Sequence, residues 1–398
     1  MSRIYLDHNA TTPVDPAVLE ALLPFLGGTY GNPSSVHREG QAARRAVDRA
    51  REQVAALLGA KPDEIVFTSG GTEANQLALA GGVEGLSEAS GRSAQLVVGA
   101  VEHPAVLETA RALGRLGHRL TIAPVDGFGR VEPREVVAAL DGGPALVSVM
   151  RAQNDVGTLQ PVAELAAALD GRALLHTDAV QAVGKLPVAV DALGVDLLSL
   201  SAHKLHGPKG VGALYVRRGA KVSRQLHGGS QELRRRAGTE NVPGIVGLGV
   251  ACELAAARLS EAARVAALRD RLAEELERRL PGLAVHGHPV ERLPNTLHVS
   301  LPGLSGNTLL MGLDLEGIAA SVGSACASGE VAGSPALRAM GLSEAEVLGS
   351  LRFSLGRGNT GAEIDRTAEV LARLVTRLRG SAVDVAVAAL TAAKEARP

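Results

Sequence analysis

VDLLSLSAHKLHGPKG, residues 195 to 210, joins an apolar run to a polar loop that contains glycine, and this stretch decides how the fold is interpreted. Its first part, Val195 to Leu200, predicts a buried β-strand, and Ser201-Ala202-His203-Lys204 follow it directly. Apolar runs alternate with helix-like stretches in the same way over residues 40–250. This alternation predicts an α/β fold with a mainly parallel central sheet flanked by helices on both faces. Sites on such sheets lie beyond the carboxyl ends of the strands.

The predicted elements divide the chain into a larger and a smaller part. After about residue 255 the alternation gives way to a long charged helix with mixed strands and helices, which predicts a smaller α+β domain. We expect a large domain at 13–255 and a small domain at 256–398, which the N-terminal segment 1–12 joins. The expected strands are 64–68, 95–99, 145–150, 173–176, 195–200 and 211–216, and the expected helices are 44–58, 72–80, 104–116, 162–169 and 264–280.

The bulk composition narrows the functional classes. The 398 residues exceed one comfortable hydrophobic core, which agrees with two domains. The formal net charge of −1 provides no overall field for nucleic acid or anionic lipid, so we expect neither as a direct partner. No apolar run approaches the ~20 residues that cross a bilayer. The N-terminus, MSRIYLDHNATTP, lacks the apolar core of a signal peptide, and there are two cysteines, so we expect a cytoplasmic, reducing location.

Lys204 is the first candidate for catalysis. A lone lysine after a strand is usually a surface residue, but Asp178 also follows a predicted strand, 26 positions earlier. A carboxylate can pair with a protonated pyridine nitrogen, and a partly deprotonated lysine can form a Schiff base. Together these two residues indicate an enzyme that uses pyridoxal 5′-phosphate.

Two further stretches extend this pattern. SGGTEANQ (69–76) joins a predicted strand to a predicted helix, and Gly71 and Thr72 stand at the helix start, where backbone N–H groups favour a phosphate. An ordinary helix cap is the alternative for such a turn. His103, in AVEHPAV, suits stacking on a cofactor ring and proton transfer, because its pKa lies near neutrality. A satisfied polar histidine is the alternative there, and we expect no metal ligand in the chain.

The order of these residues resembles that of the fold type I pyridoxal-phosphate enzymes, and longer motifs resemble the cysteine desulfurases of the NifS/IscS type. GSACASG (323–329) and GGSQELRRRAGTENV (228–242) are the most specific of these motifs. The others are YLDHNATTP (5–13), YGNPSSVH (30–37), FTSGGTEANQ (67–76), HTDAVQAVGK (176–185), SAHKLHGPKG (201–210) and RFSLGR (352–357), in family order.

The resemblance implies a role for each matching residue. Lys204 would bind the cofactor as a Schiff base, Asp178 would pair with the pyridine nitrogen, and His103 would stack on the ring and take part in catalysis. Thr239 would reach the phosphate of the partner subunit's cofactor, which implies a homodimer with shared active sites. The remaining ligands would be Gln181 and Asn154 at the ring hydroxyl, Gly71, Thr72, Ser201 and His203 at the phosphate, and Arg352, Asn32 and Asn154 at the substrate, L-cysteine.

Cys326 is the residue that points most directly to sulfur chemistry. It lies among Gly, Ser and Ala, which is typical of a mobile loop, whereas Cys252, in GVACELAAA, is typical of a buried structural cysteine. The resemblance implies that the Cys326 thiolate attacks the sulfur of bound cysteine, keeps it as a persulfide and leaves alanine. A sulfur-acceptor protein is then expected. Iron–sulfur cluster assembly and tRNA thiolation both start from such a persulfide, and the sequence does not choose between them.

Several alternatives stay open. A selenocysteine lyase would share the site, whereas an aminotransferase needs no loop cysteine, and a non-enzymatic scaffold would not need Lys204 with Cys326. The family's asparagine pair and glutamate appear here as Gln153-Asn154-Asp155, before Val156-Gly157. The segment 329–341 lacks the glutamate-proline-serine run of relatives, which puts the loop's partner contacts in doubt. Arg234-Arg235-Arg236 is either a solvated loop or a contact for an anion or a partner.

Overall fold

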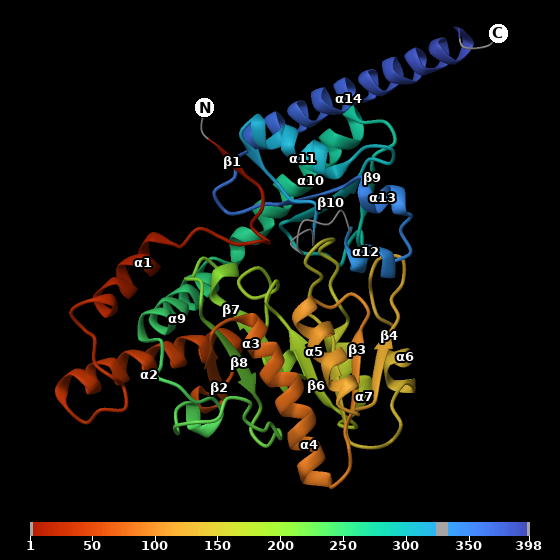
Figure 1. The fold of residues 1–398 in the computed structure, drawn as a ribbon. Helices are drawn as coiled ribbons and strands as arrows, with labels where there is room; N and C mark the ends of the chain where they lie inside the picture. The colour runs from red at the N-terminus through yellow and green to blue at the C-terminus, as the bar shows by residue number, and fades with distance from the viewer. Residues whose placement is uncertain (1–2, 324–332, 396–398) are drawn as a thin grey trace.

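The computed structural model describes residues 3–323 and 333–395, with side chains as far as residue 380. Its centre is a seven-stranded sheet in the order β2-β8-β7-β6-β5-β3-β4 (Figure 1). Neighbours from β7 to β4 pair in parallel, whereas β8 is antiparallel to both β7 and β2. The predicted mainly parallel α/β sheet is thereby confirmed. The strands are β2 (Ile65–Thr68), β3 (Gln95–Gly99), β4 (Leu120–Ala123), β5 (Ala145–Ser148), β6 (Leu174–Asp178), β7 (Leu197–Ser201) and β8 (Gly212–Val216).

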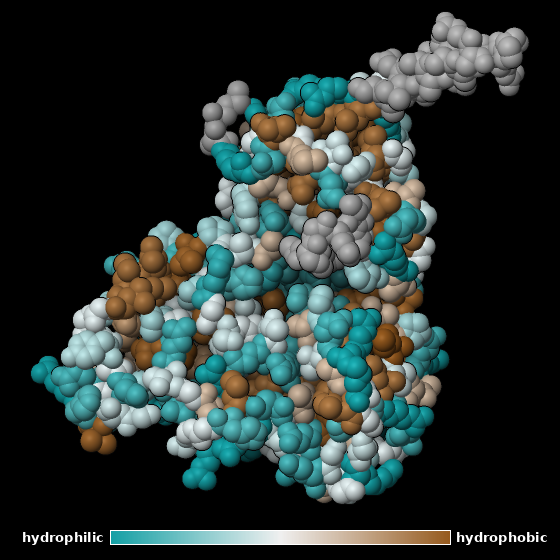
Figure 2. Space-filling view, in the orientation of Figure 1, coloured by the Kyte–Doolittle hydropathy of each residue, from teal (hydrophilic) through white to brown (hydrophobic). Residues whose placement is uncertain are grey.

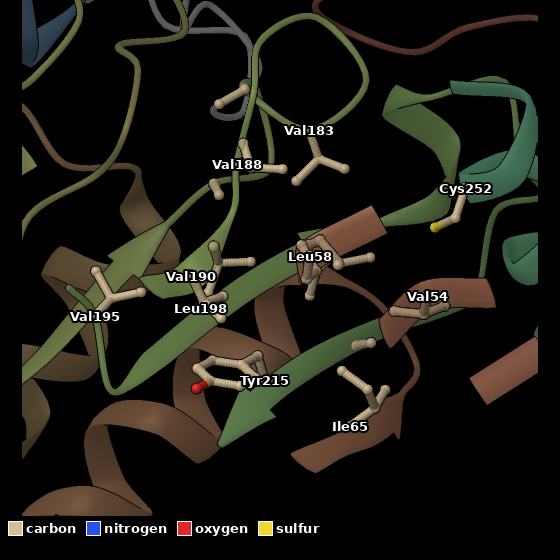
Figure 3. Packing of buried hydrophobic residues seen from close by; sticks show 14 of the residues in the cluster. Val54, Leu58, Ile65, Val183, Val188, Val190, Val195, Leu198, Tyr215 and Cys252 are labelled. Carbon is tan, nitrogen blue, oxygen red and sulfur yellow. The ribbon is translucent and has the colours of Figure 1, made fainter. Parts of the chain in front are cut away.

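The middle strands are mostly apolar and almost wholly buried because helices cover both faces of the sheet. Strand β7 is buried at every position. Its consecutive residues Leu197 and Leu198 belong to two different hydrophobic clusters, since successive side chains on a strand point to opposite faces. Figure 3 shows the cluster of Leu198, in which Leu58 and Cys252 are labelled. The apolar runs in the sequence therefore mark strands with two buried faces.

The helices on the two faces come from different parts of the chain. The face of Leu198 is covered by α2 (Arg38–Leu58), α7 (Val162–Leu169) and α9 (Val242–Ala257), whose buried residues join that cluster. The opposite face is covered by α3 (Gly71–Gln76), a π-helical turn at Leu77–Gly81 and α5 (Pro104–Arg115). The other elements of this part are α1 (Pro16–Leu22), η1 (Leu23–Leu26), η2 (Pro62–Glu64), α4 (Gly82–Ser90), α6 (Pro133–Ala138), α8 (Val190–Leu193), η4 (Ala202–Lys204) and η5 (Glu232–Arg234).

Some predicted boundaries were wrong. The strand predicted at 145–150 ends at Ser148, and the helix predicted at 72–80 is interrupted at Leu77, where the hydrogen-bond pattern widens to a π turn. Strand β4 was not predicted at all. It lies at the sheet edge, and Leu120 to Ile122 are partly exposed, so it lacks the continuous apolar run of the inner strands.

The C-terminal part builds a second, smaller sheet. Strands β12, β10 and β9 pair antiparallel, and β1 (Ile4–Tyr5) pairs with β11 (Ile318–Ala319). A separate hydrophobic cluster joins Leu6 to Phe353 and Leu371 in this part. The domain boundaries at residues 13 and 255 stay a prediction. The elements here are α10 (Ala262–Arg279), β9 (Ala284–His286), β10 (Thr296–Ser300), α11 (Gly306–Leu315), α12 (Pro335–Ala339), α13 (Glu344–Leu348), β12 (Ser350–Ser354) and α14 (Gly361–Glu395), with η6 at Leu259–Glu261.

Within the described chain, no helix taken singly has the length and apolar character needed to cross a membrane. One pair, Val242–Ala257 with Leu259–Arg279, passes that test of length and composition only in combination, with a bend of 57° between its members.

Candidate active site

The candidate residues of the large sheet lie where strands end. Asp178 is the last residue of β6, Lys204 ends the short turn η4 that follows β7, and Gly70 and Gly71 follow β2. Because β2, β6 and β7 run in the same direction, their carboxyl ends share one edge of the sheet. A cavity of about 420 Å³ opens there. Its lining residues are Ala10, Thr11, Ser69, Gly70, Gly71, Thr72, Glu73, Ser201, His203, Lys209 and Gly210.

Close packing requires glycine at Gly71 and at Gly212, which faces the loop after β2. A Cβ on Gly71 would lie 2.9 Å from a methyl carbon of Val180, and one on Gly212 would lie 2.7 Å from the carbonyl carbon of Gly70. Gly70 itself has φ +157°, which side chains rarely adopt. The loop therefore brings bare backbone to the cavity wall at the start of α3, where N–H groups have no partner within the helix.

The N-terminal segment, for which the sequence predicted no role in the site, contacts Lys204. Its Nζ donates hydrogen bonds to the carbonyl oxygens of Asn9 (2.5 Å) and Ala10 (2.8 Å). Gln181 Nε2 also donates to the Asn9 carbonyl, at 2.9 Å. Lys185 Nζ donates to Gln181 Oε1 at 2.7 Å, and burial followed by the nearby charge of Lys204 lowers the pKa of Lys185 to about 7. Asn9 and Lys185 stand inside quoted motifs, but no pattern in the sequence singled them out.

Asp178 is buried and held from two sides. Its Oδ1 accepts the Val180 N–H at 2.9 Å, and its Oδ2 accepts Asn75 Nδ2 at 2.7 Å. Glu102 lies close enough for the charge of Asp178 to act on it, and burial raises the pKa of Glu102 well above its usual range. Burial thus disfavours a second negative charge on Glu102 beside Asp178.

Two histidines border the site in different ways. His103 is exposed and caps α5, since its Nδ1 accepts the Ala105 N–H at 3.1 Å, which leaves Nε2 for another partner. His203 lines the cavity, with its Nδ1 3.1 Å from Thr11 Oγ1. Burial, and then the charge of Lys204, lower the pKa of His203 to about 4. His203 is accordingly a neutral hydrogen-bonding group at pH 7.

Arg352 reaches the same region from β12. It is 5% exposed, and its Nη1 donates to Asn154 O at 3.2 Å and to Asp155 Oδ1 at 3.1 Å, while Nη2 donates to Asp7 Oδ1 at 2.9 Å. Asn154 O also accepts Asn9 Nδ2 at 3.1 Å. Lys204 and Arg352 are thus joined through Asn9 and Asn154. The Asn154 side chain donates to Asp155 Oδ1 at 2.9 Å.

Two predicted site residues, Asn32 and Thr239, lie apart from this group in the described chain. Asn32 is exposed in the loop between η1 and α2, and its Oδ1 accepts the Ser34 N–H. Thr239 is also exposed, and it lines a separate cavity that shares only the wall residues Ser69 and Gly210 with the first. Cys326 lies outside the described residues.

The other cysteine and the arginine run have clear positions. Cys252 is fully buried, as the sequence predicted, and burial raises the pKa of its thiol. Of the run 234–236, Arg234 is exposed, whereas Arg236 Nε and Nη2 donate to the two carboxylate oxygens of Glu73 at 2.7 and 3.1 Å. Of the two interpretations of this run, the solvated loop therefore fits Arg234 but not Arg236.

The family model for class-V aminotransferases matches residues 4–367. The chain belongs to that family. A cysteine desulfurase of Trichormus azollae is 48% identical over 381 residues, covering 95% of this chain and 94% of the relative. The cysteine desulfurase IscS of Dictyoglomus turgidum is 46% identical over 378 residues, covering 94% and 95%. The solved structure of a NifS-like protein has a TM-score of 0.86 at 39% identity and covers 94% of this chain and 99% of its own.

Pyridoxal 5′-phosphate is the cofactor of the family. The residues of this chain fit it. The cavity that His203 lines also has the bare Gly70–Gly71 backbone, hydroxyl groups and Lys209 in its wall, and these groups suit a phosphate. Asn75 Oδ1 and Thr177 Oγ1 are buried without a hydrogen-bond partner in the described chain. Asn75 is bonded to Asp178 through its Nδ2, and Thr177 precedes Asp178 in β6. Unsatisfied buried polar groups of this kind are typical of a site whose ligand supplies the missing contacts.

Proposed function

We propose that the protein is a cysteine desulfurase that converts L-cysteine to L-alanine and receives the sulfur on Cys326. The observation that carries this proposal is the connected group of Lys204, Asn9, Asn154 and Arg352. It joins an amine suited to the reacting carbon to a guanidinium suited to a carboxylate. In an α-amino acid the reacting Cα is bonded directly to the carboxylate carbon, so one substrate can reach both Lys204 and Arg352.

The work of the chain's own residues follows from this arrangement. Arg352 would bind the substrate carboxylate, and Lys204 Nζ would move the proton at Cα. Bound pyridoxal 5′-phosphate supplies the electron-withdrawing ring, which Asp178 would keep protonated at its nitrogen. The C–S bond of the substrate breaks and an S–S bond to Cys326 Sγ forms, so cysteine and a thiol become alanine and a persulfide. No external oxidant is needed for this step.

The flanks of the Cys326 segment support the assignment of this residue. A Cβ on Gly323 would lie 3.2 Å from the carboxylate of Asp155, and Ser334 Oγ donates to Asp155 Oδ2 at 2.8 Å. Asp155 is the residue that pairs with Arg352. The chain therefore enters and leaves residues 324–332 beside the proposed substrate-binding arginine.

The proposal includes a homodimer in which Thr239 completes the partner's site. Two observations support it. Thr239 is exposed in the single chain, whereas the resemblance implies that it binds a phosphate, which a partner subunit would bring to it. An apolar patch also covers α1 and η1 on the surface (Figure 2), where Leu19, Leu23 and Leu26 are 47%, 52% and 65% exposed. Contiguous exposed apolar surface of this kind marks interaction sites.

The proposal also covers the setting of the reaction. We propose a cytoplasmic location, where reductants can clear the persulfide before the next cycle. A sulfur-acceptor protein is the second partner that we propose. Iron–sulfur assembly and tRNA thiolation are the acceptor systems that the persulfide would suit.

A single-turnover experiment tests the activity. The protein, loaded with pyridoxal 5′-phosphate, is mixed with L-cysteine without reductant, and alanine and protein persulfide are measured by mass spectrometry. The parent and Cys252→Ser should each release about one alanine per site and carry the extra sulfur on Cys326. Cys326→Ser should release almost none, since a serine hydroxyl stays protonated at neutral pH. Normal alanine release by Cys326→Ser, or a persulfide on Cys252, contradicts the proposal. A strong preference for L-selenocysteine in parallel assays would make selenocysteine the natural substrate.

A further inference from the structure

Arg352 is held by two carboxylates with different surroundings. Asp155 accepts Nη1 at 3.1 Å with its side chain 1% exposed, whereas Asp7 accepts Nη2 at 2.9 Å with its side chain 20% exposed. A buried guanidinium needs one compensating charge, and the second carboxylate makes this group negative by one unit. A substrate carboxylate arriving at Arg352 would be a third anion beside one guanidinium, which favours release of one of the two.

Asp155 is built into the fold. Its Oδ1 accepts Arg352 and the Asn154 side chain, and its Oδ2 accepts Ser334 Oγ at 2.8 Å. Removing this carboxylate from Arg352 would break several buried hydrogen bonds at once, each of which is costly to leave unmade. Asp155 is therefore the fixed partner of the guanidinium.

Asp7 is placed for exchange. It belongs to the N-terminal segment, its Oδ1 accepts Arg352 Nη2 at 2.9 Å, and the charge of Lys204 also acts on it. Burial raises the pKa of Asp7 more than Arg352 lowers it, which shows that its charged form is weakly stabilised there. Its side chain is also more exposed than that of Asp155, so another carboxylate reaches its place more readily.

We infer that Asp7 occupies the place of the substrate carboxylate on Arg352 and is displaced when the substrate binds, while Asp155 remains. This inference rests on the proposed function, because it takes Arg352 as the carboxylate ligand. Asp7 thus competes with the substrate and sets how tightly α-amino acids bind. It acts by orienting and occupying Arg352, not by touching the reacting atoms.

The test measures equilibrium binding of L-alanine, the reaction product, to the loaded enzyme by isothermal titration calorimetry. Asp7→Asn keeps the shape of the side chain but replaces an ion pair with a weaker hydrogen bond in which only the guanidinium is charged. Alanine should bind Asp7→Asn about three- to tenfold more tightly than the parent, because less is lost when the neutral amide, rather than the carboxylate, leaves Arg352. L-Alaninamide, which has no carboxylate, should bind both proteins equally. Asp365→Asn, which alters an exposed carboxylate paired with Arg271, is the matched control and should change nothing.

Two further outcomes separate this inference from the proposed function. Arg352→Gln should lose most alanine binding, and if it binds alanine like the parent, the role of Arg352 in the proposed function is wrong. If Arg352→Gln binds weakly but Asp7→Asn binds alanine no more tightly than the parent, or alaninamide gains as much as alanine, only the exchange is overturned. Thermal unfolding and cofactor absorbance of Asp7→Asn show that the comparison is made on folded, loaded protein.

Discussion

The ammonium nitrogen of Lys204 lies 2.5 Å from the carbonyl oxygen of Asn9, a residue 195 positions earlier in the chain. The Asn9 side chain is buried and bonded on both sides. Its Nδ2 donates to Thr296 Oγ1 at 2.9 Å, and its Oδ1 accepts Asn295 Nδ2 at 3.0 Å. The N-terminal segment is therefore fixed against β10 and forms one wall of the site beside Lys204.

We predict that Asn9→Ala lowers the free energy of unfolding by about 2–4 kcal/mol, because it leaves several buried partners unsatisfied. Urea unfolding of the loaded protein measures this change. Asn307→Ala removes an exposed asparagine of α11 and should cost less than about 0.5 kcal/mol. Equal losses in the two variants would show that the Asn9 network does not stabilise the fold.

The inner part of the fold was predictable because its signals are local. Strands β3 and β7 are buried at every position since both faces are covered, and such a mostly apolar run is visible in a short window of the sequence. Strand β4 was missed for the opposite reason, as an edge strand with partly exposed residues has no such run. The break at Leu77 was missed because a π turn has no composition of its own.

The site was predictable only in part. Asp178 and Lys204 follow strands, so their meeting at one sheet edge follows from the predicted topology. The contacts of Asn9 with Lys204 and of Asp7 with Arg352 join residues far apart in sequence, and no periodicity encodes them. Asn32 and Thr239 are exposed and lie apart from this group in the single chain, so their roles stay predictions.

Lys185 gives the fold a pH dependence of predictable sign. Its pKa falls from 10.5 to about 7 in the folded protein, mainly through burial. Between these values the unfolded chain binds the proton and the folded protein does not, so stability rises with pH across this window. Below pH 7 both states are protonated, and the full cost of burying the charge is present.

We therefore predict that the free energy of unfolding of Lys185→Met compares best with that of the parent at pH 6 to 7. The parent should regain stability as the pH rises toward 9. Urea unfolding at a series of pH values gives the difference. Lys221→Met, at an exposed lysine, should show a difference that does not vary with pH. A constant difference for Lys185→Met as well would mean that Lys185 keeps its charge in the folded protein.

The loop that carries Thr239 begins at a strained turn that a buried ion pair holds. Glu232, Leu233 and Arg234 all have positive φ, between 46° and 65°, which costs non-glycine residues about 1–2 kcal/mol each. Glu232 compensates by accepting Arg51 Nη1 and Nη2 at 2.8 and 2.6 Å and the Phe67 N–H at 2.8 Å. The pair ties the turn to α2 and β2.

We predict that Arg51→Met destabilises the protein by about 3–5 kcal/mol, because it leaves the Glu232 carboxylate buried without its partner. Arg218→Met, which breaks an exposed pair with Asp63, should cost no more than about 1 kcal/mol. Denaturant unfolding distinguishes the two. Adding Glu232→Gln to Arg51→Met should restore part of the loss, and a fully additive double variant would rule out direct coupling.

Mixing two defective chains decides whether Thr239 acts across the subunit interface. In a Lys204→Ala homodimer no site has its lysine, and in a Thr239→Ala homodimer every site lacks its threonine. If Thr239 serves the partner's site, a mixed dimer contains one intact site, composed of Lys204 from one chain and Thr239 from the other. Random exchange in an equal mixture makes half of the dimers mixed, so about a quarter of all sites should be intact.

We predict that alanine formation in this mixture exceeds the average of the two separate variants and approaches about a quarter of the parent rate. If Thr239 serves its own subunit, no intact site forms and the mixture equals the average. The reciprocal mixture, parent with a chain that carries both substitutions, gives the opposite outcome. A Thr239 that acts across the interface would then impair the only lysine-bearing site of each mixed dimer, whereas one that acts within its own chain would leave that site intact. Native mass spectrometry verifies that the chains have exchanged before the rates are compared.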